Sequence, residues 1–193
     1  MNDVIRNILG RRSVRAYKPA QISQEDLELI LEAGRYAPSG MNAQSWRFTA
    51  IQNPAVLKQV NEAIRRTLLS LPVGPETTAY TISLIEKAAE ENADFLYRAP
   101  TLVIVTNRSD SRHAMADSAL ALGSMMLAAH SLGIASCWLN QLATYTHMPP
   151  IRALLADLDV PPDHNVYGAA ALGYAAEEPE PVPRKDGVIH VIS

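Results

Sequence analysis

Cysteine is almost absent from this chain of 193 residues, in which Cys137 is the one example. A disulfide within the chain is therefore excluded, and such sparse use is typical of a reducing compartment. The longest apolar run, MMLAAHSLGIASCWL, is interrupted by His130, Ser131 and Gly133, whereas a membrane-spanning helix needs about 20 apolar residues. The first residues also lack the apolar core of a secretory signal. We therefore expect a cytoplasmic protein without a membrane partner.

A large excess of charge of one sign is also missing. The chain has 17 Lys and Arg against 20 Asp and Glu, and its net charge of −3 does not favour nucleic acid as a partner. The five histidines lack metal-ligand spacing, so we expect no metal site. Glycine-rich phosphate loops of the Walker or dinucleotide-binding type are absent as well. With 48% hydrophobic residues, the composition is that of a globular protein, and we expect residues 1–193 to form a single domain.

Hydrophobic periodicity predicts alternating helices and strands without strict βαβ regularity. The predicted helices cover residues 24–36, 55–69, 81–97, 113–132 and 149–158, and the predicted strands cover 47–53, 101–107, 134–140, 166–174 and 187–193. Ser23 is the expected N-cap of the first of these helices, and Gly133 is expected to end the fourth. The pattern favours an α+β sandwich in which helices surround a mixed central sheet.

The predicted helix 113–132 is apolar on almost every face. In a chain of this size, such a helix is most easily buried if a second subunit covers one of its faces. The small residues that would let two backbones approach closely are Ala121, Gly123, Ser124 and Ala128. We therefore expect a homodimer in which this long helix lies at the interface.

Two stretches carry residues suited to a polar ligand. In GRRSVRAY, Arg11, Arg12 and Arg15 surround Ser13, so guanidinium groups and a hydroxyl could hold a phosphate. The alternative is a solvated loop whose arginines pair with nearby acids. In APSGMNAQSWRF, the amides of Asn42 and Gln44 suit a heterocycle edge or a ribityl chain, although an ordinary loop preceding a core tryptophan is the alternative.

Together with LAAHSLGIASCWL, ALGY and PVPRKDG in the same order, these stretches make the chain resemble the nitroreductase family of FMN-dependent oxidoreductases. The resemblance implies that Arg11 and Ser13 contact the FMN phosphate and that Arg15 reaches the flavin near N1 and O2. Arg12 is similar to a variable basic position of the family. Arg184 matches a phosphate contact near the C-terminus.

Other cofactor contacts implied by the resemblance come from more distant parts of the chain. Pro38, Ser39, Gly40 and Asn42 match a segment that family members supply from the opposite subunit, which implies a homodimer with shared FMN sites. Asn140 and Gln141 match a loop over the flavin face, and Asn92 matches an amide at its pyrimidine edge. The chain departs from many relatives at Gly40 and Ser45, where they have serine and proline, and at Asn140 and Gln141, where they often have glutamate and glycine.

The activity implied is reduction of nitroaromatics, quinones or a related acceptor with NADH or NADPH, by a ping-pong mechanism. The flavin does the chemistry, so no certain catalytic side chain is assigned and Arg15 is expected to tune the flavin. Two alternatives stay open: a flavin- or ligand-binding protein of the same fold without turnover, and a specialised dehalogenating or flavin-fragmenting enzyme. Cys137 is expected to be a small buried hydrophobe rather than a nucleophile.

Overall fold

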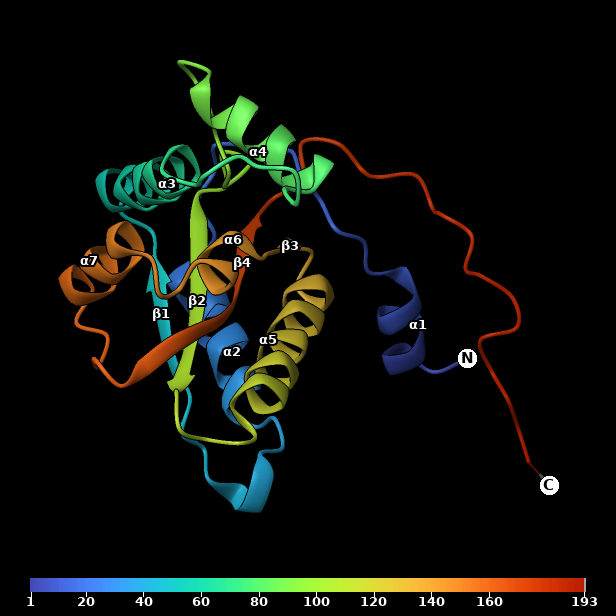
Figure 1. The fold of residues 1–193 in the computed structure, drawn as a ribbon. Coiled ribbons are helices and arrows are strands. Elements are labelled where there is room, and N and C mark those ends of the chain that lie inside the picture. The colour runs from blue at the N-terminus through green and yellow to red at the C-terminus, as the bar shows by residue number, and fades with distance from the viewer. Residues whose placement is uncertain (193) are drawn as a thin grey trace.

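A four-stranded sheet forms the centre of the computed structural model, which describes residues 1–192. The strands lie in the order β1-β2-β4-β3 (Figure 1), and they are β1 (Arg47–Ile51), β2 (Thr101–Arg108), β4 (His164–Gly173) and β3 (Ala135–Leu139). Every neighbouring pair is antiparallel. The α+β class is confirmed, but the expected mixed sheet is antiparallel in these four strands, and its parallel component is a single bridge between Ser13 and Ser136.

Helices cover both faces of this sheet (Figure 1). In chain order they are α1 (Asp3–Gly10), α2 (Gln24–Arg35), the 3₁₀ turn η1 (Gly40–Asn42), α3 (Pro54–Leu69), α4 (Ala79–Ala89), α5 (Ala114–Ser131), α6 (Gln141–Thr144) and α7 (Pro149–Asp157). The predicted caps are confirmed, because Ser23 accepts a hydrogen bond from the Asp26 amide and Gly133 has a left-handed φ of 74°. Of these helices, α1, η1 and α6 were not predicted.

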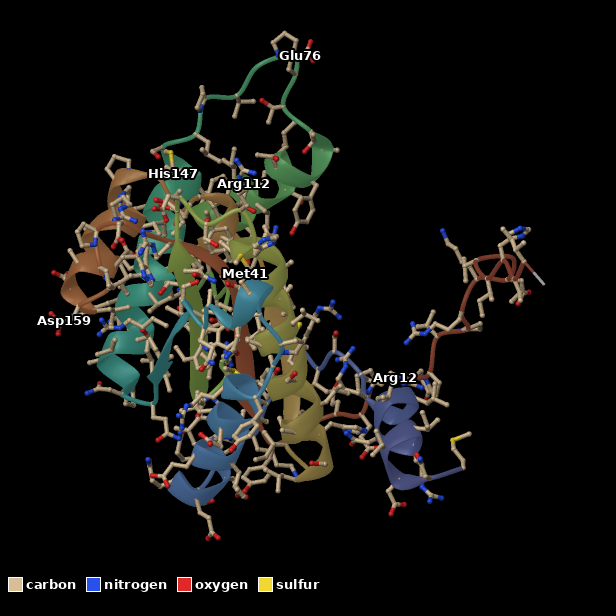
Figure 2. The ribbon with its side chains drawn as sticks, turned by 90° about the horizontal axis from the view of Figure 1, so that it is seen from below. Arg12, Met41, Glu76, Arg112, His147 and Asp159 are labelled. Atoms are coloured by element: carbon tan, nitrogen blue, oxygen red, sulfur yellow. The ribbon has the colours of Figure 1, made fainter. Side chains whose placement is uncertain are left out.

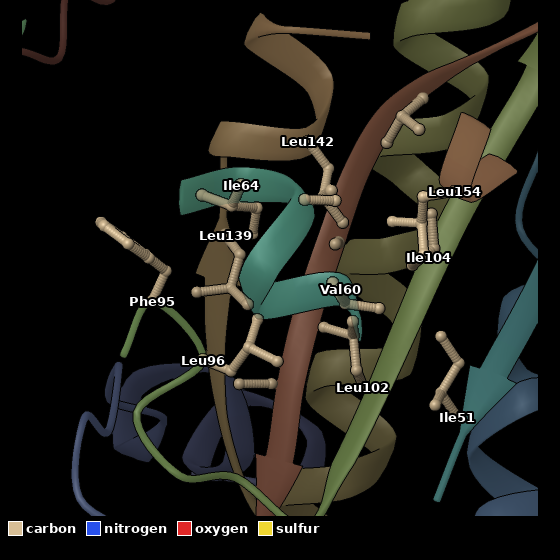
Figure 3. Packing of buried hydrophobic residues seen from close by; sticks show 14 of the residues in the cluster. Ile51, Val60, Ile64, Phe95, Leu96, Leu102, Ile104, Leu139, Leu142 and Leu154 are labelled. Carbon is tan, nitrogen blue, oxygen red and sulfur yellow. The ribbon is translucent and has the colours of Figure 1, made fainter. Parts of the chain in front are cut away.

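The central strand β2 divides the core into two clusters, because successive side chains of a strand point to opposite faces. Leu102 and Ile104 belong to the cluster under α3 and α7 (Figure 3), whereas Val103 and Val105 belong to the cluster under α2 and α5. All four side chains are buried. The uninterrupted apolar run of this strand is thus explained by a sheet covered on both sides.

The helix predicted over 81–97 is wrong at its C-terminal half, because α4 ends at Ala89. Side-chain hydrogen bonds hold the following segment as a loop. Asn61 donates to the Ala93 carbonyl and accepts from the Phe95 amide, and the Asp94 carboxylate accepts from the Arg98 amide. These bonds satisfy backbone groups that a continued helix would otherwise use.

The strand predicted over 187–193 is also wrong for the described residues 187–192, which form neither strand nor helix. The chain leaves the sheet after Tyr17 pairs with Ala175, and the remaining tail runs away from the body (Figure 1). Val188, Ile189 and Val191 are exposed there. An alternating apolar sequence cannot form a strand without a neighbouring strand for its backbone groups.

The long helix α5 confirms the predicted helix over 113–132 to within a residue at each end. Its buried face packs on α2 and the sheet, whereas Met115 and Leu120 are exposed. A Cβ added at Gly123 would meet no atom within 4 Å. Among residues 1–192, no helix is long and apolar enough to span a bilayer.

Candidate functional site

The arginine-rich segment after α1 runs alongside β3. The Val14 amide donates to the Ser136 carbonyl at 3.1 Å, and the buried Tyr17 hydroxyl donates to the Val14 carbonyl at 2.8 Å. These bonds fix the backbone on both sides of Arg15. Arg15 itself is exposed. The segment is therefore an ordered edge of the sheet, which orients its alternating side chains.

A cavity of about 440 Å³ lies between this segment and the C-terminal end of α5. Arg11, Arg12, His130 and Ser136 line it together with backbone of the turn at Gly133. Three buried donor atoms in these residues have no hydrogen-bond partner among residues 1–192, namely Arg11 Nη1, Arg12 Nε and Ser136 Oγ. Buried donors are normally paired, so this wall is suited to an anionic ligand rich in acceptors.

The arginines of this wall have different local roles. Arg12 Nη1 donates to the carbonyls of Leu9, Gly10 and Arg11, and these bonds satisfy carbonyl groups at the end of α1. Arg11 forms no such bond, so its guanidinium is free for a ligand. Two glutamates of the tail, Glu178 and Glu180, also line the cavity, so its lining carries charge of both signs.

Arg15 and Cys137 lie close enough to influence one another. The pKa of Arg15 is raised, first by the charge that Cys137 would carry if it were ionised and then by Tyr97. An arginine is a cation at neutral pH without this shift. Burial raises the pKa of the Cys137 thiol, and Arg15 opposes this shift only in part. The protonated thiol is buried in β3, in keeping with the expected role of a small hydrophobe.

The segment from Pro38 to Gln44 is held at the other end of α5. The Gly40 amide donates to Asp117 Oδ1 at 2.9 Å, and the second carboxylate oxygen, Oδ2, is buried without a partner among the described residues. A Cβ on Gly40 would lie 2.5 Å from the His113 ring. This close approach leaves no room for a side chain at position 40 unless the ring moves.

The exposed tip of this segment has unusual backbone conformations. Met41, Asn42 and Gln44 all have left-handed φ values, at 54°, 56° and 46°. Asn tolerates this region better than Met does. Met41 therefore adopts an unfavourable backbone conformation although its side chain, which is 97% exposed, makes little contact within the chain. Gln44 donates to Ser39 Oγ through its amide and to Asn42 Oδ1 through its side chain, which stabilises the turn.

Within one chain, the two predicted flavin-binding segments lie far apart. In Figure 2 the tip at Met41 lies over the middle of the body, whereas Arg12 lies away from it beside α1. The first is attached to α5 at Asp117, and the end of α1 is attached through Asn7, which donates to the Leu127 carbonyl. Ten residues of helix separate these attachments by about 15 Å along the axis.

The remaining predicted contacts lie outside the cavity of Arg11. Asn140 and Gln141 follow β3 where α6 begins, and Gln141 Oε1 is buried without a partner in residues 1–192. Arg184 is exposed on the tail, and Asn92 is exposed beside Arg65 in another surface hollow. The flavin contacts of these four residues therefore stay predictions.

Sequence reasoning missed three polar residues around the site: His130, Ser136 and Asp117. Their signal is weak, because a polar residue within an apolar helix or strand is identified only when its neighbours are known. Ser136 is 1% exposed and Asp117 is 3% exposed, so both are polar groups inside the core. Among residues 1–192, no cluster of His, Cys, Asp or Glu side chains could hold a metal ion.

The chain thus has an α+β fold with helices on both faces of the sheet and a cavity lined by Arg11 and Arg12 at one edge. The Nitroreductase family matches residues 8–174, and the chain belongs to this family of oxidoreductases. The fold aligns with an FMN-bound nitroreductase structure from Bacteroides fragilis at a TM-score of 0.91 and 43% identity, with 100% of both chains covered.

Two sequence relatives broaden the range of activities. One, from Archaeoglobus fulgidus, carries the provisional name NADH dehydrogenase/NAD(P)H nitroreductase and is 30% identical over 178 residues, which cover 92% of this chain and 88% of the relative. The other is an iodotyrosine deiodinase from Thermotoga neapolitana, 26% identical over 186 residues, which cover 93% of this chain and 92% of the relative.

Proposed function

We propose that this chain is an FMN-dependent oxidoreductase that uses NADH or NADPH to reduce a nitroaromatic, a quinone or a related acceptor by a ping-pong mechanism. The whole chain would act as one FMN-binding unit in the cytoplasm. The observation that carries the proposal is the set of unpartnered donors at Arg11, Arg12 and Ser136. They line a cavity in a chain 43% identical to a nitroreductase with bound FMN.

The donor set fits a phosphate monoester. Arg11 supplies a guanidinium without an internal partner, and Ser13 is half-buried next to it on the segment that pairs with β3. Charge-assisted hydrogen bonds of this kind are the stronger class of protein hydrogen bonds. Arg184 would add a further cation from the tail.

When bound, FMN would supply the two-electron chemistry that links NAD(P)H to the acceptor. The chain's own residues would bind and orient it. Arg15, an exposed cation, would place positive charge beside the pyrimidine edge, where negative charge develops on reduction. The side chain of Asn92 and the loop at Asn140 and Gln141 would contact the pyrimidine edge and the flavin face.

We also propose that two copies of the chain build each flavin site. The distance along α5 between Asp117 and the cavity wall supports this, because one chain does not bring Pro38–Asn42 to Arg11. The open face at Gly123 allows a second helix to approach closely. The exposed Met41 tip then has a surface to contact, which accounts for its strained backbone.

A second candidate function is reductive dehalogenation of a halogenated aromatic compound. The deiodinase relative favours it, because it aligns with nearly the whole of both chains. A flavin-binding protein without turnover and a flavin-fragmenting enzyme are the further alternatives. All of them share the proposed FMN site and differ in what the reduced protein does.

The test is a visible spectrum of the purified protein followed by anaerobic addition of NADH or NADPH. We expect a yellow protein that releases FMN rather than FAD on denaturation, is bleached by the nicotinamide and is reoxidised by a nitroaromatic or quinone. FMN should also raise the thermal midpoint. Bleaching without reoxidation by these acceptors, but with reoxidation by a halogenated phenol, would favour the second candidate. Colourless protein that takes up no FMN contradicts every flavin-based proposal.

A further inference from the structure

His130 is the one side chain of the donor cavity that has no assigned role. It lies in the last turn of α5 and lines the cavity with Arg11, Arg12 and Ser136. Its ring is half-buried and forms no hydrogen bond to residues 1–192. An imidazole can donate from both nitrogens once protonated, so it offers the cavity two further donors.

The neighbouring backbone leaves room for this ring. A Cβ on Gly10 would lie 3.0 Å from His130 Nε2, so a larger residue at the end of α1 would press against the imidazole. Glycine at this position therefore leaves room for the ring, which lines the same cavity as Arg11 and Arg12. The arrangement brings three basic side chains from two segments to one wall.

The position also favours a cation on this ring. The last turn of a helix carries partial negative charge, which disfavours an anion nearby unless cations offset it. A dianionic phosphate bound against this helix end would therefore gain from a third positive charge. A protonated histidine in the last turn would be favoured by the helix dipole as well.

We propose that His130 is a further phosphate ligand of this cavity and that it binds the phosphate as the imidazolium, so that cofactor binding takes up a proton. The inference rests on the proposed function, because the phosphate in question is that of FMN. The proton moves from solvent to the ring, and no covalent bond in the cofactor changes.

The charges around the ring set the direction of this linkage. Without a ligand, the pKa of His130 is lowered, first by burial and then by Arg11 and Arg12. Glu178 and Glu180 line the rim of the same cavity, yet neither raises this pKa, and Asn7 on the adjoining α1 is uncharged. A phosphate dianion placed among these cations would raise the pKa again.

The contribution of His130 makes FMN affinity fall as pH rises. The contribution of His130 to FMN affinity is complete below its pKa in the free protein and is lost as pH rises through its pKa in the complex. The phosphate's own second pKa of about 6 also titrates, but it does so equally in every variant. The ratio of affinities between wild type and variant therefore isolates the ring.

The experiment measures FMN dissociation constants from pH 5.5 to 9 for wild type, His130→Gln and the matched control His190→Gln, a tail histidine that is exposed. We expect His130→Gln to bind about tenfold to a hundredfold more weakly than wild type near pH 6, the range for a hydrogen bond to a charged group, and this ratio to shrink toward pH 9. His190→Gln should follow wild type, and riboflavin, which lacks the phosphate, should show no such ratio.

A second measurement needs no variant. Calorimetric titration of the wild-type apoprotein with FMN near pH 7, in two buffers of different ionisation enthalpy, should reveal net proton uptake. A ratio between wild type and His130→Gln that stays constant with pH, or the absence of proton uptake, overturns the role of His130 while FMN binding stands. Failure of the wild type to bind FMN overturns the proposed function together with this inference.

Discussion

The two ends of α5 differ in a way that defines the site. At the C-terminal end, a cavity is lined by donors that lack partners, including Arg11 Nη1 and Ser136 Oγ. At the N-terminal end, the turn at Gly40 is held by Asp117 and presents an exposed strained tip. The C-terminal end of α5 therefore has the unpaired donors but no segment that closes over them. The N-terminal end has an exposed polar turn but no cavity lined by such donors. This difference between the two ends supports our proposal that two chains build each site.

The largest effect is expected from a charge placed between the two ends. Gly123→Glu should abolish both dimer and bound FMN, because an unpaired charge would be buried at the interface. The isolated chain should still fold, since a Cβ there meets no atom within 4 Å and glycine is a poor helix former. Sedimentation equilibrium with flavin absorbance measures both outcomes.

Gly74→Glu is the matched control, because a Cβ at this exposed loop glycine also meets no atom within 4 Å. It should remain dimeric and yellow. A Gly123→Glu protein that stays dimeric with stoichiometric FMN would contradict the proposed interface.

A smaller effect is expected at the cavity end. Arg15→Ala should weaken FMN binding by about tenfold to a hundredfold, the range for loss of a charge-assisted hydrogen bond, and should slow flavin reduction. Arg184→Ala should mainly weaken binding. Stopped-flow reduction at saturating FMN separates the two effects, and Arg35→Ala, which removes an exposed arginine paired with Glu32, is the control. Equal reduction rates for wild type and Arg15→Ala would refute the electronic role.

At the other end of α5, a serine at position 40 should disturb the turn. Gly40→Ser would place a Cβ 2.5 Å from the His113 ring, so the ring or the turn would have to shift. We expect weaker FMN binding, measured by fluorescence titration, and recovery in the double variant Gly40→Ser/His113→Ala. A double variant no better than the single one would show that the ring is not the obstacle.

The smallest effect is expected on stability, at His164 of β4, which lies at neither end of α5. The pKa of His164 is lowered, first by burial, so the folded state binds this proton less readily than the unfolded state. Stability is therefore fully present above the ordinary histidine pKa of about 6.5 and declines as pH falls, by at most about 1.4 kcal/mol per pH unit. Urea titrations of wild type and His164→Gln should diverge in pH dependence below pH 6.5; parallel curves would exclude this residue as the cause.

Most of the fold could be predicted from the sequence, because periodic apolar faces are local information. The strand Thr101–Arg108 and the helices at Gln24–Arg35 and Ala114–Ser131 follow from their own residues. The prediction of a strand over 187–193 is wrong for residues 187–192, because a strand needs a neighbouring strand and the local sequence does not show whether one is present. By contrast, α1 could have been predicted, because Val4, Ile5, Ile8 and Leu9 recur at helical spacing, although none of its residues is buried in the single chain.

The same distinction between local and long-range information applies to the candidate site. Arg11, Arg12 and Ser13 could be predicted because they are clustered in the sequence, and the structure brings two of them to one cavity. His130 and Ser136 join them only through folding, from a helix and a strand more than 100 positions further along the chain. Asp117 could not be connected with Gly40 for the same reason.

The most direct test of the central claim combines two defective chains. Arg11→Glu damages only the cavity end, and Asp117→Ala damages only the turn end, so neither homodimer should hold FMN well. If each site joins the two ends across chains, a heterodimer has one intact site and one doubly defective site. An equal mixture unfolded and refolded together should then recover about one quarter of the wild-type FMN sites by random pairing of identical subunits. No recovery above that of the separate variants would place both ends in the same chain's site and contradict the account.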